Sequence, residues 1–113
     1  MIYLICRNRV IDLARWKRVF DSQATAHRLA TLGLLHIWRG MESPDDLFLV
    51  FEVDNIGRAR DYMNSREVAA ANKAASIVHS EHHFVESARR LTWSSLQAFE
   101  PDQQTLQAAV PPL

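Results

Sequence analysis

The sequence contains few of the residues that mark flexible linkers or disulfide-bonded folds. Its 113 residues include 3 Gly, 4 Pro and 1 Cys. The shortage of Gly and Pro excludes a low-complexity linker, because such chains are rich in both. The lone Cys6 cannot form a disulfide within the chain, which is typical of a reducing compartment, and we expect a cytoplasmic protein. The length fits one domain.

Neither sign of charge predominates, and no long hydrophobic run is present. The 13 Lys and Arg residues balance the 13 Asp and Glu residues, whereas a general nucleic-acid binder carries a basic excess. No apolar run approaches the roughly 18 residues of a membrane helix. The N-terminal apolar run is broken at Arg7 and lacks the basic lead of a secretory signal. We therefore expect neither nucleic acid nor a membrane as a partner.

Hydrophobic periodicity predicts strands and helices in alternation over residues 1–87. Strands are predicted at residues 2–10, 34–41, 47–53 and 79–86. Helices are predicted from Leu13 to about Leu32, from residue 55 to Met63 and from Arg66 to Ala75. Asp12, Asn55 (or Asp54) and Ser65 are the expected N-caps, and Gly33 is expected to end the first helix.

This βαββαβ order predicts an α+β fold, a ferredoxin-like sandwich with a four-stranded antiparallel sheet. The helices cover one face of such a sheet, yet the first and third strands are apolar on both faces. The simplest cover for the second face is the same face of another copy. We therefore predict a two-fold homodimer joined through the sheet faces.

A C-terminal arm, residues 88–113, follows the predicted domain at residues 1–87. We expect a short helix before Pro101 and an arm docked on the domain or on the partner subunit. The apolar residues that make it unlike a solvated tail are Leu91, Trp93, Leu96, Phe99, Leu106 and Val110.

Four short motifs carry a resemblance to the dimeric α/β-barrel superfamily, which includes the antibiotic-biosynthesis-monooxygenase-like proteins. They are Trp16-x-x-x-Phe20-Asp21, Ile37-Trp38-Arg39 before Ser43-Pro44-Asp45, Phe51-Glu52-Val53-Asp54, and Tyr62-Met63-Asn64-Ser65-x-x-Val68. The resemblance covers about residues 1–87 and implies a dimeric barrel with a ligand cavity between helices and sheet. Members include cofactor-free oxygenases, haem-degrading enzymes, isomerases, cyclases and proteins with no known activity, so fold alone does not select a reaction.

The resemblance also supplies candidate residues by position. Asn8 stands where the haem-degrading members have an asparagine late in the first strand, and Tyr62 stands where they have a tryptophan. Asn72 stands where they have the axial histidine, and an amide cannot replace imidazole on haem iron. We therefore expect no cofactor, with Asn8 and Tyr62 bonding to substrate oxygens and Asn72 contributing to substrate binding.

His27 falls on the apolar stripe of the first helix together with Trp16 and Phe20. It is either an acid or base beside the cavity or a histidine at the edge of the core that binds a backbone carbonyl. Trp16 and Phe20 either line a pocket for substrate or fill the core. Arg39 either binds an anionic substrate or pairs with Glu52 across neighbouring strands.

His79, His82 and His83 suggest a metal site at first sight. On a strand, residues 79 and 83 lie about 13 Å apart on one face, and His82 points to the other face. Zinc ligands must all lie about 2 Å from the ion. We therefore expect no metal site.

Three functions compete. The first is an enzyme acting on a hydrophobic aromatic or polyketide-like molecule, as a cofactor-independent monooxygenase, an isomerase or a cyclase, with His27, Tyr62 and Asn8 as catalytic residues. The second is a non-catalytic ligand-binding or stress-associated dimer. The third is RNA binding, which shares the element order but needs two aromatic side chains on one strand face. Phe48 and Phe51 are three residues apart and face opposite ways, which disfavours it.

Overall fold

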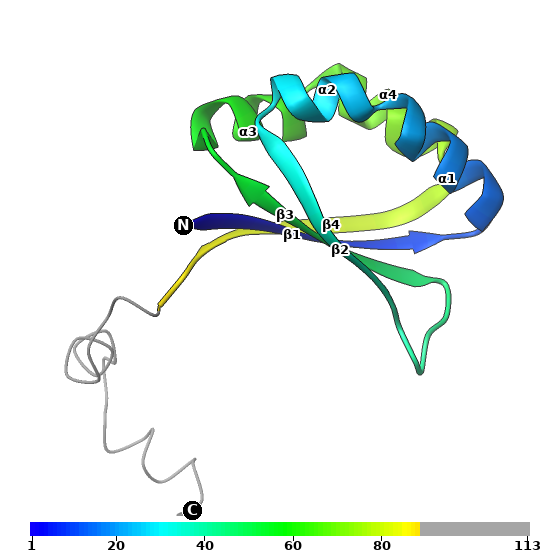
Figure 1. Cartoon of the computed structure of the whole chain (residues 1–113). Helices are drawn as coiled ribbons and strands as arrows, with labels where there is room; N and C mark the ends of the chain where they lie inside the picture. Colours follow the sequence, from blue (N-terminus) through cyan, green and yellow to red (C-terminus); the bar gives the residue numbers. More distant parts are fainter. Residues whose placement is uncertain (89–113) are drawn as a thin grey trace, which may run out of the picture.

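The computed structural model describes residues 1–88, and within them a four-stranded antiparallel sheet carries the helices on one face (Figure 1). The strands are β1 (Ile2–Val10), β2 (Leu32–Arg39), β3 (Asp46–Val53) and β4 (Ile77–Glu86). The helices are α1 (Leu13–Ser22), α2 (Ala24–Leu29), α3 (Ile56–Met63) and α4 (Arg66–Ala74). The strand order β2-β3-β1-β4 confirms the predicted α+β fold of the ferredoxin-like type. The predicted arm lies outside the described residues, apart from Ala88.

The strand predictions hold best for the central strands. β1 spans the predicted residues, and β3 begins at Asp46, one residue before the predicted start. β4 begins before the predicted residue 79, because its backbone pairs with β1 from Glu86 opposite Ile2 to Ile77 opposite Val10. These backbone bonds hold a polar edge strand that the side-chain pattern alone describes poorly.

The prediction of one helix from Leu13 to about Leu32 is wrong. Gln23 separates α1 from α2, and its N–H donates to Phe20 O at 3.1 Å, which closes α1 with a tighter turn. α2 ends at Leu29. The residue that reverses the chain is Thr31, whose φ of 61° is left-handed, and Gly33 lies within β2 with no positive φ. As a result β2 starts two residues earlier than predicted.

The predicted N-caps are confirmed. Asp12 accepts a hydrogen bond from the backbone of Arg15, and Asn55 accepts one from Arg58, each at 3.0 Å. Ser65 caps α4 in the same way. Each cap satisfies a backbone donor that the first helical turn cannot, which is worth about 1 kcal/mol.

The first half of the domain, from β1 to β2, and the second half, from β3 to β4, are joined by two matching hydrogen-bonded contacts. We call these contacts clasps, and each is formed by a hydroxyl residue with a left-handed backbone. Thr31 follows α2 and Ser76 follows α4, and both have a φ of 61°. The Thr31 hydroxyl accepts from Asn55 N and donates to Asn55 O, and the Ser76 hydroxyl does the same with Asp12 N and O. Each clasp therefore links the end of one helix pair to the N-cap of the other.

The core lies between the helices and the sheet. Leu4 on β1 and Leu49 on β3 are the largest fully buried side chains. Trp16 on α1, Ala59 on α3 and Val68 on α4 face them from the helices and are also buried. Burial of these side chains supplies the main driving force for this arrangement.

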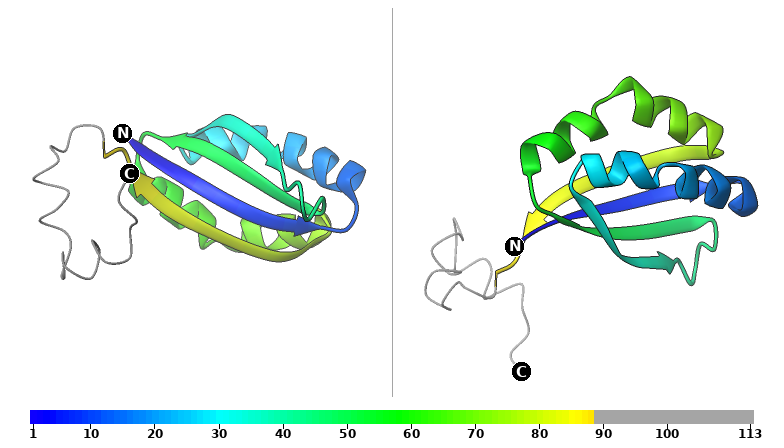
Figure 2. Two further views of the ribbon diagram at one scale, coloured as in Figure 1. Left: turned by 90° about the horizontal axis from the view of Figure 1, so that it is seen from below. Right: turned by 45° about the horizontal axis from the view of Figure 1, so that its top comes forward.

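The opposite face of the sheet, which Figure 2 shows from below, bears no helix in the described residues. Tyr3 and Ile5 on β1 and Phe48 and Val50 on β3 lie on this face and are half-buried. The prediction of apolar side chains on both faces of these strands is therefore confirmed for this part of the sheet.

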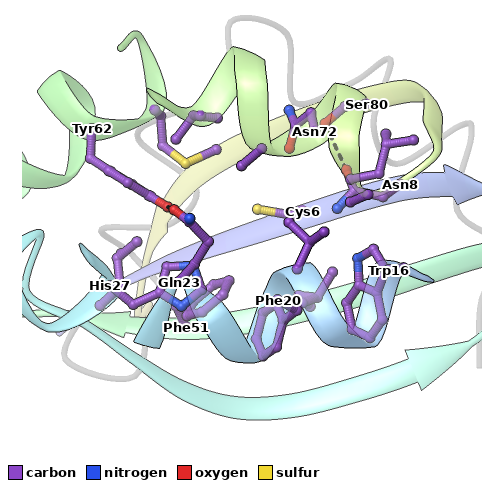
Figure 3. A pocket seen from close by; sticks show the side chains of 18 residues that line it. Cys6, Asn8, Trp16, Phe20, Gln23, His27, Phe51, Tyr62, Asn72 and Ser80 are labelled. Atoms are coloured by element: carbon purple, nitrogen blue, oxygen red, sulfur yellow. Dashed lines mark hydrogen bonds between the residues drawn. The ribbon is translucent and has the colours of Figure 1, made fainter. Parts of the chain in front are cut away.

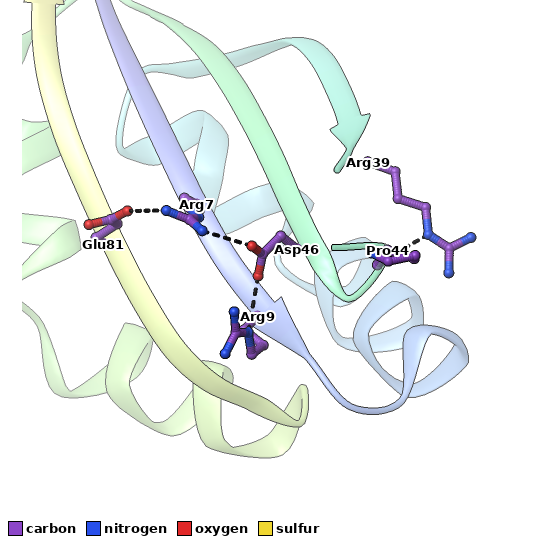
Figure 4. A network of polar contacts seen from close by, with 6 residues as sticks. All are labelled: Arg7, Arg9, Arg39, Pro44, Asp46 and Glu81. Carbon is purple, nitrogen blue, oxygen red and sulfur yellow. Dashed lines mark hydrogen bonds and ion pairs between the residues drawn. The ribbon is translucent and has the colours of Figure 1, made fainter. Parts of the chain in front are cut away.

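A charged network occupies the other end of the same open face (Figure 4). Asp46 is 3% exposed and accepts hydrogen bonds from Arg7 Nη2 at 2.9 Å and Arg9 Nε at 3.2 Å. Glu81 on β4 lies 3.5 Å from Arg7 Nη1. The hydrogen bond from Arg7 is the main reason that the pKa of Asp46 is lowered. The open face thus combines apolar side chains with a charged network, and Phe48 lies beside Arg7 where the two meet.

Candidate functional site

A pocket lies between the helices and the helix-facing side of the sheet (Figure 3). Its volume is about 80 Å³. Six of the seven predicted substrate and catalytic residues line it, namely Asn8, Trp16, Phe20, His27, Tyr62 and Asn72. They come from β1, α1, α2, α3 and α4, so the fold rather than any local motif brings them together.

Aromatic rings form one wall of the pocket. Trp16 and Phe20 stack on α1 with ring centroids 4.9 Å apart, as their four-residue spacing allows. The imidazole of His27 lies 5.1 Å from Phe20, 5.5 Å from Phe51 and 5.8 Å from Tyr62, centroid to centroid. The break at Gln23 changes the course of the helix between Phe20 and His27, yet both side chains still face the pocket.

The imidazole of His27 is partly buried, and its nitrogens are free of hydrogen bonds within the described residues. Burial lowers the pKa of the imidazole, because the charged form loses its hydration, so the ring is neutral at pH 7. Within residues 1–88 the ring nitrogens make no hydrogen bond, so the alternative of a histidine bonded to a backbone carbonyl is not what the structure shows. A neutral imidazole with an unoccupied lone pair can accept a proton.

Tyr62 is already engaged by a partner that the sequence analysis did not assign to the site. Its hydroxyl donates to Gln23 Oε1 at 3.0 Å. Burial, assisted by the charge of Glu67, raises the pKa of Tyr62 to about 12. The phenol is therefore protonated at neutral pH and offers lone pairs to a ligand. The signal that could have identified Gln23 in the sequence was its position on the apolar stripe between Phe20 and His27.

Asn8 forms the other polar end of the pocket. Its side chain is held on the helix-facing side of β1 and is 8% exposed. The hydroxyl of Ser80, opposite it on β4, donates to Asn8 Oδ1 at 2.6 Å. Asn72 approaches the same end from α4 (Figure 3). Ser80 was missed because the strand register, which pairs residues 8 and 80, cannot be read from the sequence.

Cys6 lies between the two polar ends and lines the pocket. Burial raises the pKa of its thiol to about 12, so the thiol stays protonated at neutral pH. Cys6 is thus a small buried residue and not an activated nucleophile.

Arg39 lies apart from this pocket. Its Nε donates to Pro44 O at 2.7 Å, at the turn between β2 and β3 (Figure 4). In the sheet Arg39 stands opposite Leu47, whereas Glu52 stands opposite Gly33 and Tyr3. The alternative of an Arg39–Glu52 ion pair is therefore wrong, because the register separates the two residues by most of the strand.

The histidines of β4 are separated by the strand geometry. His79 and His83 stand opposite Arg9 and Ile5, on the open face, and His82 stands opposite Cys6, on the helix-facing side. In residues 1–88 no group of three His, Cys, Asp or Glu side chains is close enough to hold a metal ion.

No helix in this part of the chain is long and apolar enough to cross a membrane.

A second, more open groove adjoins the pocket. It has a volume of about 260 Å³, and its lining includes Asp21 and Leu34. Phe20, His27, Leu32 and Phe51 line both spaces. The pocket and the groove therefore border on the same side chains.

The chain matches no known protein family profile and no curated protein. Its structure, however, matches several solved proteins at low identity. One is a proposed antibiotic biosynthesis monooxygenase from Bordetella bronchiseptica, with 16% identity, a TM-score of 0.59 and coverage of 76% of this chain and 95% of that one. Another is an uncharacterised NIPSNAP domain protein from Burkholderia xenovorans, with 10% identity, a TM-score of 0.58 and coverage of 81% and 99%.

A third match is a proposed antibiotic biosynthesis monooxygenase from Deinococcus radiodurans, with 15% identity and a TM-score of 0.57. It covers 81% of this chain and 97% of that one. These likenesses confirm the predicted resemblance at the level of the fold, which hosts more than one function.

Proposed function

We propose that this protein binds a small, neutral, hydrophobic molecule that carries at least one oxygen function. The observation that supports this most strongly is the lining of the pocket, in which an apolar body ends in the polar groups of Asn8 and Tyr62. Among the described lining residues none is Lys, Arg, Asp or Glu. A charged ligand would lose its hydration there without a counter-charge, so the pocket favours neutral molecules.

The size of the pocket limits what it holds. A buried cavity of about 150 Å³ accepts benzene, and this pocket, at about 80 Å³, is smaller. An aromatic substrate must therefore extend into the adjoining groove past Phe20 and His27, which line both spaces. The ligand would then lie with its oxygen inside and its larger apolar part beside the rings.

His27 is the residue that would make this binding site an enzyme. A neutral imidazole can remove a proton from a carbon activated by a neighbouring carbonyl or aromatic ring. Asn8 Nδ2 would donate to a substrate oxygen, whereas the Tyr62 oxygen, whose hydrogen is bonded to Gln23, would accept from a substrate hydroxyl. The resulting carbanion either takes the proton back at another atom, which is an isomerisation, or adds O₂. In the second case the hydroperoxide loses water, so that R₂CH₂ and O₂ give R₂C=O and H₂O without a cofactor.

The test is turnover of anthrone or a hydroquinone in air with no added cofactor, followed by oxygen uptake and product absorbance. We expect His27→Gln to abolish turnover and His36→Gln to leave it unchanged, because His36 stacks on Trp38, away from the pocket. Absence of both turnover and saturable binding of neutral aromatic molecules would refute the proposed function.

A non-catalytic binding protein is the second candidate, and the state of Tyr62 favours it. The phenol is bonded to Gln23, and its pKa of about 12 makes it a poor acid at neutral pH. If binding is saturable but His27→Gln changes neither its affinity nor any reaction, the pocket serves only to bind.

We also propose that the open face of the sheet is covered by the same face of a second copy. Tyr3, Ile5, Phe48 and Val50 are its half-buried apolar side chains, and a two-fold axis would place this face against itself. The face carries both arginines and carboxylates, and its buried carboxylate, Asp46, is already paired, so a second copy meets little net charge. Light scattering at micromolar concentration should give the mass of a dimer, and a monomer would refute the proposal.

A further inference from the structure

We infer that Ser80 is a positioning residue, which holds the Asn8 amide so that its NH₂ group faces the pocket and selects ligands with a carbonyl oxygen at that end. This inference rests on the proposed binding function, because it specifies which oxygen group the pocket prefers. Three observations support it. The Ser80 hydroxyl is bonded to the Asn8 amide, the amide nitrogen has no hydrogen-bond partner in the described residues, and Ser80 is exposed, so it can be substituted without disturbing the core.

In this structure the amide oxygen of Asn8, and not the amide nitrogen, faces β4. Asn8 and Ser80 are directly opposite each other on paired strands, with side chains on the same face. The Ser80 hydroxyl lies 2.6 Å from Asn8 Oδ1, and because that oxygen has no hydrogen, the hydroxyl is the donor. The amide is planar, so holding Oδ1 toward Ser80 turns Nδ2 away from it.

The nitrogen that is turned away borders on open space. Within residues 1–88, Nδ2 of Asn8 has no hydrogen-bond partner. Every side-chain nitrogen or oxygen that is fully buried in this part of the chain has a hydrogen-bond partner. Nδ2 is therefore accessible, although Asn8 as a whole is 8% exposed, and the space that Asn8 borders is the pocket.

A fixed NH₂ group prefers acceptors to donors. A ketone oxygen accepts from Nδ2 and has no hydrogen left to place. An alcohol can also accept, but its own hydrogen then needs an acceptor in a confined apolar site, and an unsatisfied hydroxyl costs about 1–3 kcal/mol. Asn72 lines the same end of the pocket from α4 in wild type and in every Ser80 variant, so a difference between them reports on the contact between Asn8 and Ser80.

The test compares cyclopentanone with cyclopentanol, which have nearly the same shape and which can place their oxygen in the pocket while the ring extends into the adjoining groove. Titration of ¹⁵N-labelled protein, observed at the side-chain amide of Asn8, gives both affinities and the site. We expect wild-type protein to bind the ketone about tenfold more tightly than the alcohol, which corresponds to about 1.4 kcal/mol.

Variants at Ser80 identify the cause of this preference. Ser80 is exposed on an edge strand, so its substitution leaves the core intact. We expect Ser80→Ala to reduce the ketone preference to less than about threefold, because the freed amide can present either group. Ser80→Thr keeps the hydroxyl and should restore the preference. Ser22→Ala is the control, because Ser22 bonds to Val19 O, outside this contact, and it should retain the tenfold ratio.

The outcomes separate the two proposals. If neither compound shifts the Asn8 amide, the proposed binding function fails. If both bind but the alcohol binds more tightly, the amide is held in the opposite sense and the inference is overturned. Equal affinities in wild type, or an unchanged ratio in Ser80→Ala, would also overturn the inference while leaving the binding function standing.

Discussion

The two faces of the sheet use neighbouring residues of the same strands for different purposes. On β1, Cys6 and Asn8 face the helices and border the pocket, whereas Arg7 and Arg9 face the opposite side and bind Asp46. Because successive side chains of a strand point to opposite faces, the pocket and the charged network are interleaved in sequence but separated in space. A substitution can therefore alter one face and leave the other unchanged.

The two faces also differ in what stabilises them. The helix-facing side is held by apolar packing, with Leu4 and Leu49 fully buried. The open side combines half-buried apolar residues, such as Val50, with the ion pairs of Asp46. Leu49 and Val50 are adjacent on β3 but lie on opposite faces, so substitutions at these two positions compare directly how much each face contributes to stability.

The largest loss of stability is expected from a substitution on the helix-facing side of the sheet. Leu49→Ala should lower the free energy of unfolding by about 2–5 kcal/mol, because it leaves a cavity in a packed core. Val50→Ala should cost about 1 kcal/mol or less in dilute protein, since Val50 is half-buried. Urea denaturation measures both, and equal costs would show that the open face is as tightly packed as the core.

The next effect concerns the charged network. The pKa of Asp46 is lowered in the folded protein below 3.8, chiefly by the hydrogen bond from Arg7. The folded state therefore binds this proton less readily than the unfolded chain, and the stability it contributes is present above that pH and is lost as the pH falls through the lowered pKa.

Urea denaturation between pH 5 and pH 2 measures this loss. Asp46→Asn should lower stability at pH 7 and should flatten the acid part of the profile. The exposed neighbour Asp45 provides the control, and Asp45→Asn should retain the wild-type profile. A profile for Asp46→Asn that parallels wild type would show that the two arginines contribute no stability through this carboxylate.

A smaller pH effect should come from the pocket side. The pKa of His27 is lowered by burial from 6.5, so below that pH the unfolded chain binds the proton more readily than the folded protein. The free energy of unfolding should therefore fall as the pH is lowered from about 6.5 toward the reduced pKa, and be unaffected above it. His27→Phe should remove this dependence in thermal unfolding scans, and His36→Gln should retain it.

The smallest effect is expected at Arg39, which contacts neither the pocket nor the Asp46 network. Arg39→Ala should change the free energy of unfolding by less than about 0.5 kcal/mol and leave the binding of neutral ligands unchanged in calorimetric titration. If the variant lost affinity for an anionic ligand, the sequence-based expectation of a substrate-binding Arg39 would hold and the pocket described here would be incomplete.

The sequence predicts best what depends on periodicity. Trp16, Phe20 and His27 were placed on one stripe by helical spacing, whereas Asn8 was identified by its position in the resemblance to the dimeric α/β-barrel superfamily. Gln23 was on the same stripe, but neither the helix break at this residue nor its bond to Tyr62 follows from spacing. The break is set by tertiary packing, which overrides local propensity.

What the sequence could not predict depends on register. Ser80 faces Asn8, and Arg39 is far from Glu52, only because of how strands pair. A strand shift of one residue would exchange the two faces, and no local signal in β4 fixes it. Thr31 and Ser76 likewise adopt a left-handed backbone that is unusual for their residue types, and the hydroxyl bonds that hold it join segments distant in the chain.

The paired clasps have a consequence for the connectivity of the chain. Thr31 in the first half binds the N-cap of α3, and Ser76 in the second half binds the N-cap of α1. β1 lies between β3 and β4, so the halves also interdigitate in the sheet. The two halves are therefore linked covalently by the turn between β2 and β3 alone, and after a proteolytic cut between Met41 and Asp45 we expect the two fragments to remain associated without a peptide link.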